Sequence, residues 1–260
     1  MDSMRTAATG MAAQQTTMNV ISNNLANVNT AGFKRGRVEF QDLVYRQRRV
    51  AGEATAEGVA LPVGFEVGMG TQAAAVHKIF LAGELQHTEN PMDVAIDGAG
   101  FFEVRLPDGR SAYTRDGSFK VDPQGRVVTS EGYPLSPDIT VPANASNVTI
   151  DQDGTVSATV KNSGTRSLGQ IQLVSFINPA GLESTGHNLL GATEASGHPA
   201  PGTPGTEGLG TLSQGYLEAS NVSVVEEMVK MIMAQRAYEV NGKAIQMSDE
   251  MLAMVGQMHR

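Results

Sequence analysis

Cysteine and tryptophan are both absent from this 260-residue chain, and only 5% of its residues are aromatic. The absence of cysteine excludes structural disulfides, thiolate metal sites and cysteine nucleophiles. The low aromatic content argues against a large ligand pocket lined by aromatic rings. With 40% hydrophobic residues, the chain is still able to bury a core in one or two globular units.

The chain also lacks a broad basic segment, and its net charge is −8 with an isoelectric point near 5.1. Nucleic-acid binders normally present a basic face, so we expect no nucleic-acid partner. No segment approaches about 18 consecutive apolar residues, and the first ten residues lack the apolar stretch of a secretion signal. We therefore expect no direct membrane insertion and, for a protein that works outside the cytoplasm, export without a cleaved signal peptide.

Residues that could carry catalysis or hold a metal do not form a recognisable pattern. The five histidines are scattered, without the spacing of a zinc-binding helix. The segment 151–154 resembles the start of a calcium loop, but Asn162 stands where the loop needs a bidentate glutamate, so we interpret it as a β-turn. Glu226 and Glu227 are neighbours on a predicted helix and diverge by about 100°. We expect no enzyme activity, no metal and no cofactor.

The N-terminal segment has the periodicity of a helix that packs along one face. Apolar residues recur every seven positions, and a second row follows three positions later, which is the spacing of a heptad repeat. The residues that we assign to this subunit-packing seam are Met4, Met11, Met18, Ile21, Leu25 and Val28. No charged residue occurs over 6–33, although coiled coils in water usually carry charges beside the seam. The helix is expected to stop at 29–32, with Gly32 as a left-handed cap.

The C-terminal segment predicts a longer helix, from about Ser223 to about Met258. Ser223 and Glu226 form a capping-box pattern at its start. At a rise of 1.5 Å per residue, such a helix is about 50 Å long, which exceeds the width of a small domain. The residues that we assign to its packing seam are Val224, Met228, Met231, Tyr238, Ile245 and Leu252.

The middle of the chain alternates short apolar stretches with turn-forming pairs such as Asp97-Gly98 and Asp153-Gly154. Turn signals at spacings of about 8–12 residues are typical of hairpins in an all-β unit. The expected fold is α+β, with long terminal helices in a coiled-coil-like module and a β-rich middle domain of short antiparallel strands. The expected divisions are a discontinuous helical polymerisation module (1–42 plus 216–260), extended connectors (43–72 plus 185–215) and a β-rich outer domain (73–184).

The neutral outer face of residues 6–33 and the length of the C-terminal helix both predict assembly. A helix without charged residues on its outer side is typical of one that contacts protein on several sides. We therefore predict that further copies of the chain bury this surface. The alternative is an ordinary α+β protein whose helices fold back on the β-domain.

Four long strings in the sequence match a known family. The segments 23–34, 91–102, 215–222 and 235–241 resemble the signatures of the flagellar rod and hook axial proteins, and the similarity covers almost the whole chain. The signature positions near the two ends are Asn24, Leu25, Ala26, Asn27, Asn29, Thr30, Gly32, Phe33, Lys34, Gln235, Tyr238 and Asn241. The resemblance implies export by the flagellar type III apparatus, terminal helices that form an inner tube, and a β-domain outside them.

Within that family, the length of the chain and its segment 45–68 resemble the distal-rod members most. The resemblance implies a structural subunit that self-assembles into a rigid, hollow helical drive shaft, which spans the periplasm, transmits torque to the hook and contains the export channel. The implied partners are further copies in a helical polymer, the proximal rod proteins, the hook protein, the rod cap protein, and the P-ring and L-ring proteins.

We also hypothesise that the stretch 46–64 makes the polymer rigid, because a segment inserted between helix and β-domain can bridge neighbouring subunits. The residues assigned to this stretch are Arg46, Arg48, Arg49, Leu61, Pro62 and Gly64.

Three other functions remain open from the sequence. The first is a proximal rod or hook subunit of the same family. The second is a flagellum-associated enzyme that acts on peptidoglycan, which would need a convergent pair of acidic residues. The third is an exported β-rich adhesin, which glycan binding by the middle segment would reveal.

Overall fold

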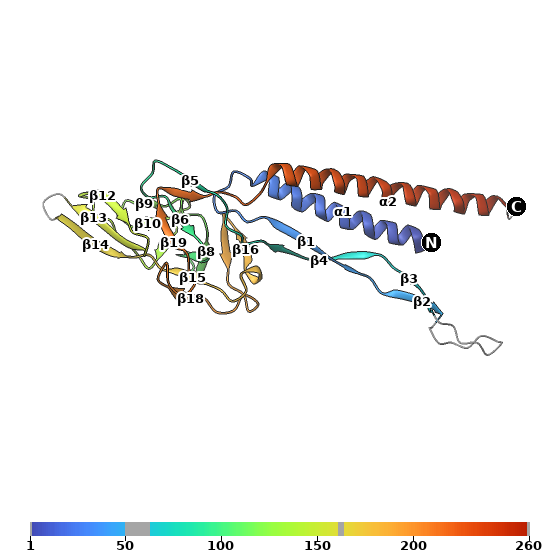
Figure 1. Cartoon of the computed structure of the whole chain (residues 1–260), viewed down its shortest axis with the longest axis horizontal. Helices are drawn as coiled ribbons and strands as arrows, with labels where there is room; N and C mark the ends of the chain where they lie inside the picture. The colour runs from blue at the N-terminus through green and yellow to red at the C-terminus, as the bar shows by residue number, and fades with distance from the viewer. Residues whose placement is uncertain (1, 50–62, 161–163, 259–260) are drawn as a thin grey trace. The chain divides into compact units, whose positions relative to one another are not determined.

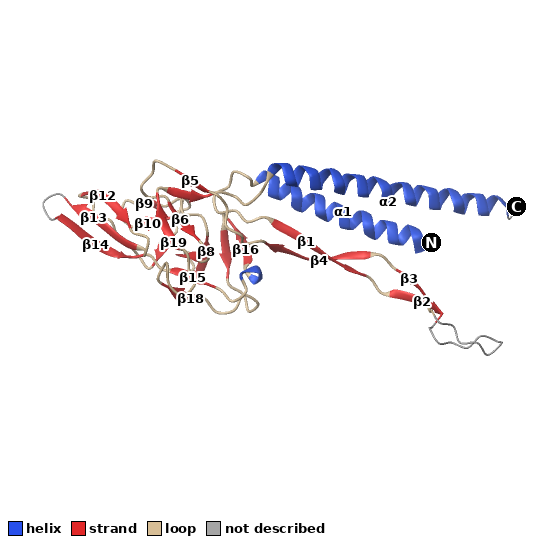
Figure 2. Cartoon of the chain, viewed as in Figure 1, coloured by secondary structure: helices blue, strands red, loops and turns tan. Residues whose placement is uncertain are grey.

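The computed structural model describes residues 2–49, 63–160 and 164–258. Contacts within the chain divide it into two compact units, of which unit 1 comprises 1–25, 36–77 and 223–260, and unit 2 comprises 26–35 and 78–222. A long helix lies at each end of the chain and short antiparallel strands lie between them (Figure 2). The predicted α+β class is therefore confirmed.

Unit 1 contains both long helices, α1 (Asp2–Ala26) and α2 (Val224–Met258), which lie side by side and run antiparallel (Figure 1). The predicted start of α2 is confirmed, and the Glu226 N–H donates to Ser223 Oγ at 3.5 Å. The predicted cap of α1 is wrong. Gly32 has the expected left-handed φ of 68°, but α1 ends earlier, at Ala26, and the Gly32 N–H donates to the Glu218 carbonyl instead.

Unit 1 also contains strands where the sequence predicts an extended connector over 43–72. The strands are β1 (Gly36–Asp42), β2 (Tyr45–Arg49), β3 (Phe65–Gly68) and β4 (Thr71–Lys78). Strand β1 pairs with β4, and β2 pairs antiparallel with β3. All the side chains of β2 are exposed, so no buried face gave the strand an alternating apolar pattern that the sequence could reveal.

The main sheet of unit 2 has seven strands, in the order β16–β17–β8–β7–β15–β18, and β11 also pairs with β7. Their bounds are β7 (Phe101–Arg105), β8 (Ser111–Thr114), β11 (Leu135–Ser136), β15 (Leu173–Ser175), β16 (Glu183–Gly186), β17 (Leu189–Gly191) and β18 (Ala200–Gly202). A short 3-10 helix, η1 (Pro179–Gly181), precedes β16.

Smaller sheets complete unit 2. A three-stranded sheet contains β12 (Ala145–Ile150), β13 (Thr155–Val160) and β14 (Gly164–Gln170). Three strand pairs join β6 (Val94–Asp97) to β19 (Thr211–Gln214), β5 (Leu85–His87) to β20 (Tyr216–Glu218), and β9 (Lys120–Val121) to β10 (Val127–Val128). The predicted turn at 151–154 is confirmed between β12 and β13, where the Gly154 N–H donates to the Asp151 carbonyl at 2.9 Å.

Strand β7 is buried on both faces and lies at the centre of the hydrophobic core. Phe102 belongs to the larger apolar cluster, where its ring meets Phe119 edge-on at a centroid distance of 5.0 Å. Phe101, its neighbour, belongs to a second cluster with Tyr113 and Phe176. Successive side chains of a strand point to opposite faces, so two adjacent phenylalanines supply both clusters.

The C-terminal part of this core lies where the sequence predicts a connector over 185–215. Strands β17, β18 and β19 occupy that segment. The buried leucines there are Leu189, Leu190, Leu209 and Leu212. They are dispersed among glycine, proline and threonine, so the composition of the segment concealed its contribution to the core.

Candidate assembly surface on the terminal helices

The contacts between α1 and α2 keep one antiparallel register. Three pairs meet across the helices: Ser3 with Ser248, Gly10 with Asn241, and Asn24 with Glu227. Along both helices the steps between these pairs are one heptad and then two heptads. The row in contact is therefore heptad-spaced, but its residues are small or polar, whereas the row predicted from the sequence is apolar.

Asn24 is the most extensively bonded residue of this contact. Its amide nitrogen donates to Glu227 Oε2 and to the Gly36 carbonyl, each at 3.0 Å, and its Oδ1 accepts the Gly36 N–H at 2.8 Å. Lys230 Nζ completes the group by donating to Glu227 Oε1 at 2.6 Å. The buried carboxylate is thus paired and hydrogen-bonded, as burial of a charge requires. Asn24 ties α1 to α2 and to the start of β1.

The apolar seam residues predicted on the two helices differ in burial. On α1, Ile21 is buried, and Met4, Met11, Met18 and Leu25 are half-buried. Val28 is half-buried but lies in the turn after α1, outside the helix on which the sequence placed it. On α2, Met231 and Ile245 are half-buried, whereas Tyr238 is 40% exposed. The remaining predicted residues of α2 are also exposed, namely Val224, Met228 and Leu252. Their assignment to contacts between subunits stays a prediction.

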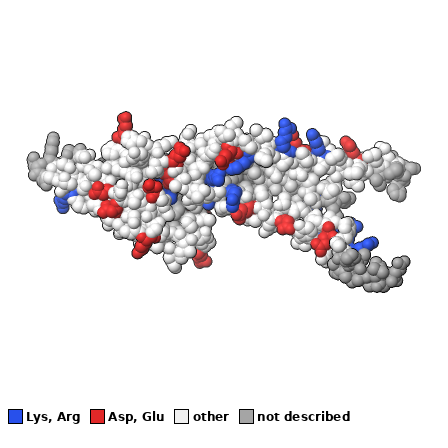
Figure 3. All heavy atoms as spheres, in the orientation of Figure 1, with Lys and Arg blue, Asp and Glu red and all other residues white. Residues whose placement is uncertain are grey.

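α2 presents a long apolar surface to solvent. Its exposed large apolar side chains are Val224, Val225, Met228, Val229, Ile232, Met233, Tyr238, Val240, Met247, Met251, Leu252 and Met254. Charged side chains are interspersed among them, and Figure 3 shows basic and acidic atoms at several places over the helices. Soluble monomers rarely expose many large apolar side chains on one element, and large exposed apolar areas mark interaction sites. Neither helix of the described ranges has both the length and the apolar character needed to cross a membrane.

In unit 2, the segment after α1 meets the segment before α2 at a buried ionic cluster. Lys34 Nζ donates to Glu218 Oε1 and, at 2.7 Å, to the Leu81 carbonyl. Arg115 Nη1 lies 3.7 Å from Glu218 Oε2. Burial lowers the pKa of Lys34, while its hydrogen bond to Glu218 and the charge of that carboxylate oppose the change. Burial also lowers the pKa of Arg115, and the charge of Glu218 opposes it.

Backbone hydrogen bonds surround this cluster. The Gly32 N–H donates to the Glu218 carbonyl at 2.8 Å, and the Gly83 N–H donates to Glu218 Oε1 at 2.9 Å. Asn221 Oδ1 accepts the Arg35 N–H at 2.8 Å, and its amide nitrogen donates to the Ile79 carbonyl at 2.8 Å. No role was assigned to Glu218 or Arg115 from the sequence. Lys34 and Glu218 are 184 positions apart, and such a separation leaves no local pattern in the sequence.

The remaining signature residues are less buried. Asn27 and Thr30 are half-buried, and Thr30 Oγ1 donates to Asn27 Oδ1 at 3.2 Å in the turn after α1. Phe33 is half-buried beneath Lys78, whose ammonium lies 5.9 Å from the ring centroid. The exposed signature residues are Ala26, Asn29, Gln235 and Tyr238.

Comparison with known proteins decides the family. The family described as "Flagella basal body rod protein" matches residues 4–34, and that described as "Flagellar basal body rod FlgEFG protein C-terminal" matches 213–258. The "Flagellar hook protein FlgE/F/G D1 domain" matches 95–158. The "Flagellar basal-body rod protein FlgG" of Buchnera aphidicola subsp. Schizaphis graminum is 51% identical over 96% of both chains. The chain belongs to the flagellar basal-body rod protein family.

Two further members of the rod family come from distant bacteria. The "Flagellar basal-body rod protein FlgG" of Borreliella burgdorferi is 50% identical over 100% of this chain and 99% of the relative. That of Bacillus subtilis is 38% identical over 99% of both. The two terminal family matches contain α1 with Lys34 and α2 with Glu218, so the buried ion pair joins the two regions that define the rod family.

The predicted rigidity stretch of this rod-family chain lies partly within the described residues. Arg46, Arg48 and Arg49 are exposed on β2, and the half-buried Gly64 precedes β3. Leu61 and Pro62 lie outside the described residues.

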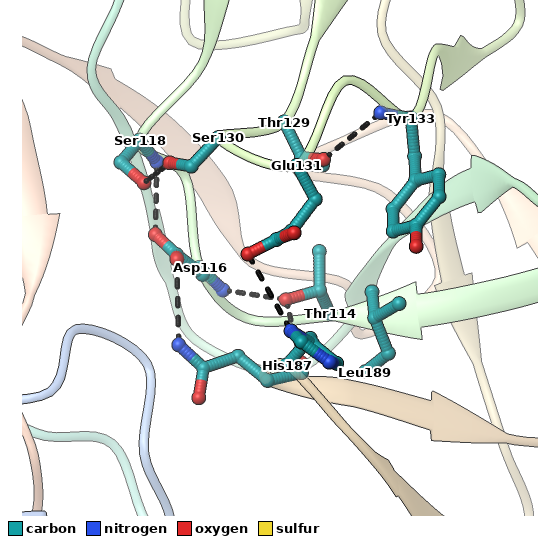
Figure 4. Close-up of a pocket in the computed structure, with 10 residues that line it drawn as sticks. Thr114, Asp116, Ser118, Thr129, Ser130, Glu131, Tyr133, His187 and Leu189 are labelled. Atoms are coloured by element: carbon teal, nitrogen blue, oxygen red, sulfur yellow. Dashed lines mark hydrogen bonds and ion pairs between the residues drawn. The ribbon is translucent and has the colours of Figure 1, made fainter.

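A polar pocket of about 280 Å³ opens on unit 2 of the rod-family chain (Figure 4). Asp116 accepts the Ser118 N–H at 3.0 Å, and Glu131 lies 3.4 Å from His187 Nδ1. Glu131 and His187 are both exposed to solvent. Among the described residues, no three histidine, aspartate or glutamate side chains are grouped to hold a metal ion. The charged groups of the pocket contact neighbouring turns, and we assign it no chemistry.

Proposed function

We propose that the chain is the structural subunit of the distal rod of the bacterial flagellar basal body, where copies assemble into a rigid, hollow helical shaft. The observation that carries this proposal is the apolar surface of α2, which stays exposed although α1 and α2 are already paired in one chain. The full-length similarity to rod proteins supports it. The function is structural, and the family membership supports a role without catalysis.

The division of labour on the helices explains how such a polymer forms. The small and polar row joins α1 to α2 within one chain, where Met11 also lies beside Gly242 of α2. This leaves the half-buried Met4 and Met18 and the apolar side of α2 for neighbouring copies. In the polymer these surfaces complete a coiled-coil-like module that surrounds the export channel, with the β-rich unit outside. The shaft spans the periplasm and transmits torque to the hook.

The neighbours of such a subunit follow from the place of the distal rod in the flagellum. At its two ends the polymer meets the proximal rod proteins and the hook protein, and the rod cap protein occupies its growing end. The P-ring and L-ring proteins surround it. These partners are inferred from the family resemblance, and the exposed strands of unit 2 supply the outward surface that they would meet.

Labelling of introduced thiols tests this function, since the chain has no cysteine of its own. In the monomer, the thiols of Met233→Cys and of Arg110→Cys should both react with a maleimide, because both side chains are exposed. In the assembled polymer, the thiol on α2 should be protected at least about tenfold while the thiol in unit 2 stays reactive. Equal reaction at the two positions in the polymer would overturn the proposal.

We also propose that the stretch 46–64 stiffens the polymer. Within the stretch, Arg46, Arg48 and Arg49 are exposed on β2, and the exposed rings of Tyr45 and Phe65 flank it. Such side chains are suited to contact with a neighbouring copy, and the deletion removes the arginines and the segment that connects the two rings. Deletion of residues 46–64 should therefore give polymers that bend more, measured as a shorter persistence length in electron micrographs. Polymers as straight and stiff as those of the unaltered chain would refute this role.

A further inference from the structure

A small pocket of about 20 Å³ lies beside the buried ionic cluster of unit 2. Its lining includes Lys34, Lys78, Arg115 and the rings of Phe33 and Phe80. Among the described residues that line it there are three cations and no carboxylate. A pocket that holds one water molecule needs about 10–15 Å³, so this one has room for a single atom of roughly that size or slightly larger.

The cations of this region exceed the carboxylate charge available to them. Glu218 is fully buried, and its Oε1 already accepts hydrogen bonds from Lys34 and from the Gly83 N–H. Arg115 is 4% exposed and donates through Nη2 to the Gly98 carbonyl at 2.6 Å. Within the described part of the chain, its Nε and Nη1 have no hydrogen-bond partner, and Glu218 Oε2, which lies 3.7 Å from Nη1, also has none. The charge of Glu218 partly compensates Nη1, so Nε is the Arg115 nitrogen left without an acceptor. Such groups are costly to bury without an acceptor.

Lys78 adds a third positive charge at the same place. Its ammonium lies 5.9 Å from the centroid of the Phe33 ring, and the structure gives it no ion pair within residues 2–49, 63–160 and 164–258. Burial lowers the pKa of Lys78, which shows that its surroundings disfavour the charged form. An aromatic face compensates only a part of that cost.

We propose that this pocket binds one monatomic anion of the size of chloride. The Nε–H of Arg115 and the ammonium of Lys78 supply the donors, and the rings of Phe33 and Phe80 exclude water around them. The volume selects a monatomic anion, because a phosphate or a carboxylate group needs more room. The bound anion stabilises the junction between the segments that follow α1 and precede α2.

Thermal unfolding of the full chain in sodium chloride and in sodium gluconate, at equal ionic strength and pH, tests this site. Chloride at a concentration well above its dissociation constant should raise the unfolding midpoint by roughly 2–4 °C relative to gluconate, because a ligand that binds only the folded state stabilises it. In Lys78→Gln this difference should vanish. In Lys120→Gln, which removes an exposed lysine from β9, it should persist.

A second measurement keeps the proposal testable where Lys78→Gln fails to fold. Crystals of the unaltered chain soaked in sodium bromide should show an anomalous peak in the pocket, within about 3.5 Å of Arg115 and Lys78 nitrogens. A water molecule there with no bromide peak would overturn the proposal. A chloride dependence of the same size in Lys78→Gln and in the unaltered chain would also overturn it.

Discussion

Glu218 links three parts of unit 2 through a single side chain and its own carbonyl group. Its carboxylate accepts hydrogen bonds from Lys34, in the segment after α1, and from the Gly83 N–H, in the segment before β5. Its backbone carbonyl accepts the Gly32 N–H. Both members of the ion pair are almost completely buried. A buried pair of this kind contributes little beyond an apolar replacement, but loss of one member leaves an uncompensated charge.

We therefore predict that Lys34→Met lowers the free energy of unfolding by about 3–5 kcal/mol, because it leaves Glu218 buried with less compensation. Urea denaturation of the purified chain measures this change. Arg110→Met removes one member of an exposed ion pair and should leave the free energy unchanged within error. The double variant Lys34→Met with Glu218→Leu should recover only a part of the loss, because it leaves Arg115 buried without a carboxylate. Equal effects of Lys34→Met and Arg110→Met would contradict the account.

The carboxylate of Asp153, in the turn between β12 and β13, should make the folding stability of the chain depend on pH in the acidic range. The pKa of Asp153 is lowered from its ordinary value of 3.8 by hydrogen bonds from the backbone N–H of Thr155 and from the Thr155 hydroxyl. A carboxylate with a lowered pKa in the folded state contributes stability above its unfolded pKa, and this contribution is lost as the pH falls through the folded pKa.

We accordingly predict that Asp153→Asn makes the unfolding free energy less dependent on pH below about 4, since the amide keeps the acceptor oxygen but does not titrate. Denaturation series from neutral pH downward measure the slope. At neutral pH the variant should lose some stability, because the ionised form is the one that the turn favours. An acid dependence as steep as that of the unaltered chain would show that this turn does not contribute to it.

At the scale of the elements, α1 and α2 pair through their least apolar row. A Cβ atom added at Gly10 would lie 2.9 Å from Asn241 Nδ2, so the two helices approach closely there. Ala13 on α1 and Ala234 on α2 are also small and buried. The pairing within one chain therefore leaves the exposed apolar side chains of α2 free for other contacts.

Gly10→Leu should separate the two helices, at a cost of roughly 1–3 kcal/mol for overpacking. Hydrogen exchange of the α1 and α2 amides should become faster by about tenfold or more, with little change in unit 2. Ala12→Leu, on the exposed side of the same helix, adds nearly the same side chain and serves as the control. The prediction fails when both variants exchange alike.

The elements with strong local signals were the ones that the sequence could predict. The capping box at Ser223 and the turn at 151–154 located α2 and a hairpin, because their hydrogen bonds involve neighbouring residues. The strands within 43–72 were not predicted, because both faces of β2 are exposed and its sequence therefore has no alternating apolar pattern. The row that joins α1 to α2 within one chain was not predicted, because a row of serine, glycine and asparagine is not distinctive. The ionic cluster at Glu218 was not predicted, because its members are far apart in the sequence and only the fold brings them together.

At the scale of the whole molecule, each chain folds by itself but keeps apolar side chains of its C-terminal helix exposed to solvent. The core of unit 2 and the pairing of α1 with α2 are complete within one copy, while the apolar side of α2 faces solvent. Assembly and folding should therefore respond to different substitutions.

Ile232→Glu should abolish polymerisation while the unfolding free energy of the monomer changes by less than about 0.5 kcal/mol, because the side chain is exposed in the single chain. Burial of a carboxylate between subunits is unfavourable without a partner. Gln246→Glu adds the same charge at an exposed polar position of α2 and should still polymerise. Sedimentation separates polymer from monomer. Normal polymers of Ile232→Glu would exclude this part of α2 from the interface.

Electron cryomicroscopy of polymers grown from the purified full chain on basal-body seeds tests the central claim most directly. The account predicts straight, hollow tubes in which α1 and α2 line the channel and the exposed apolar residues of α2 are buried between copies. Curved tubes would instead identify a hook-type subunit. Tubes in which α2 stays exposed, or a chain that remains monomeric on the seeds, would contradict assembly through the terminal helices.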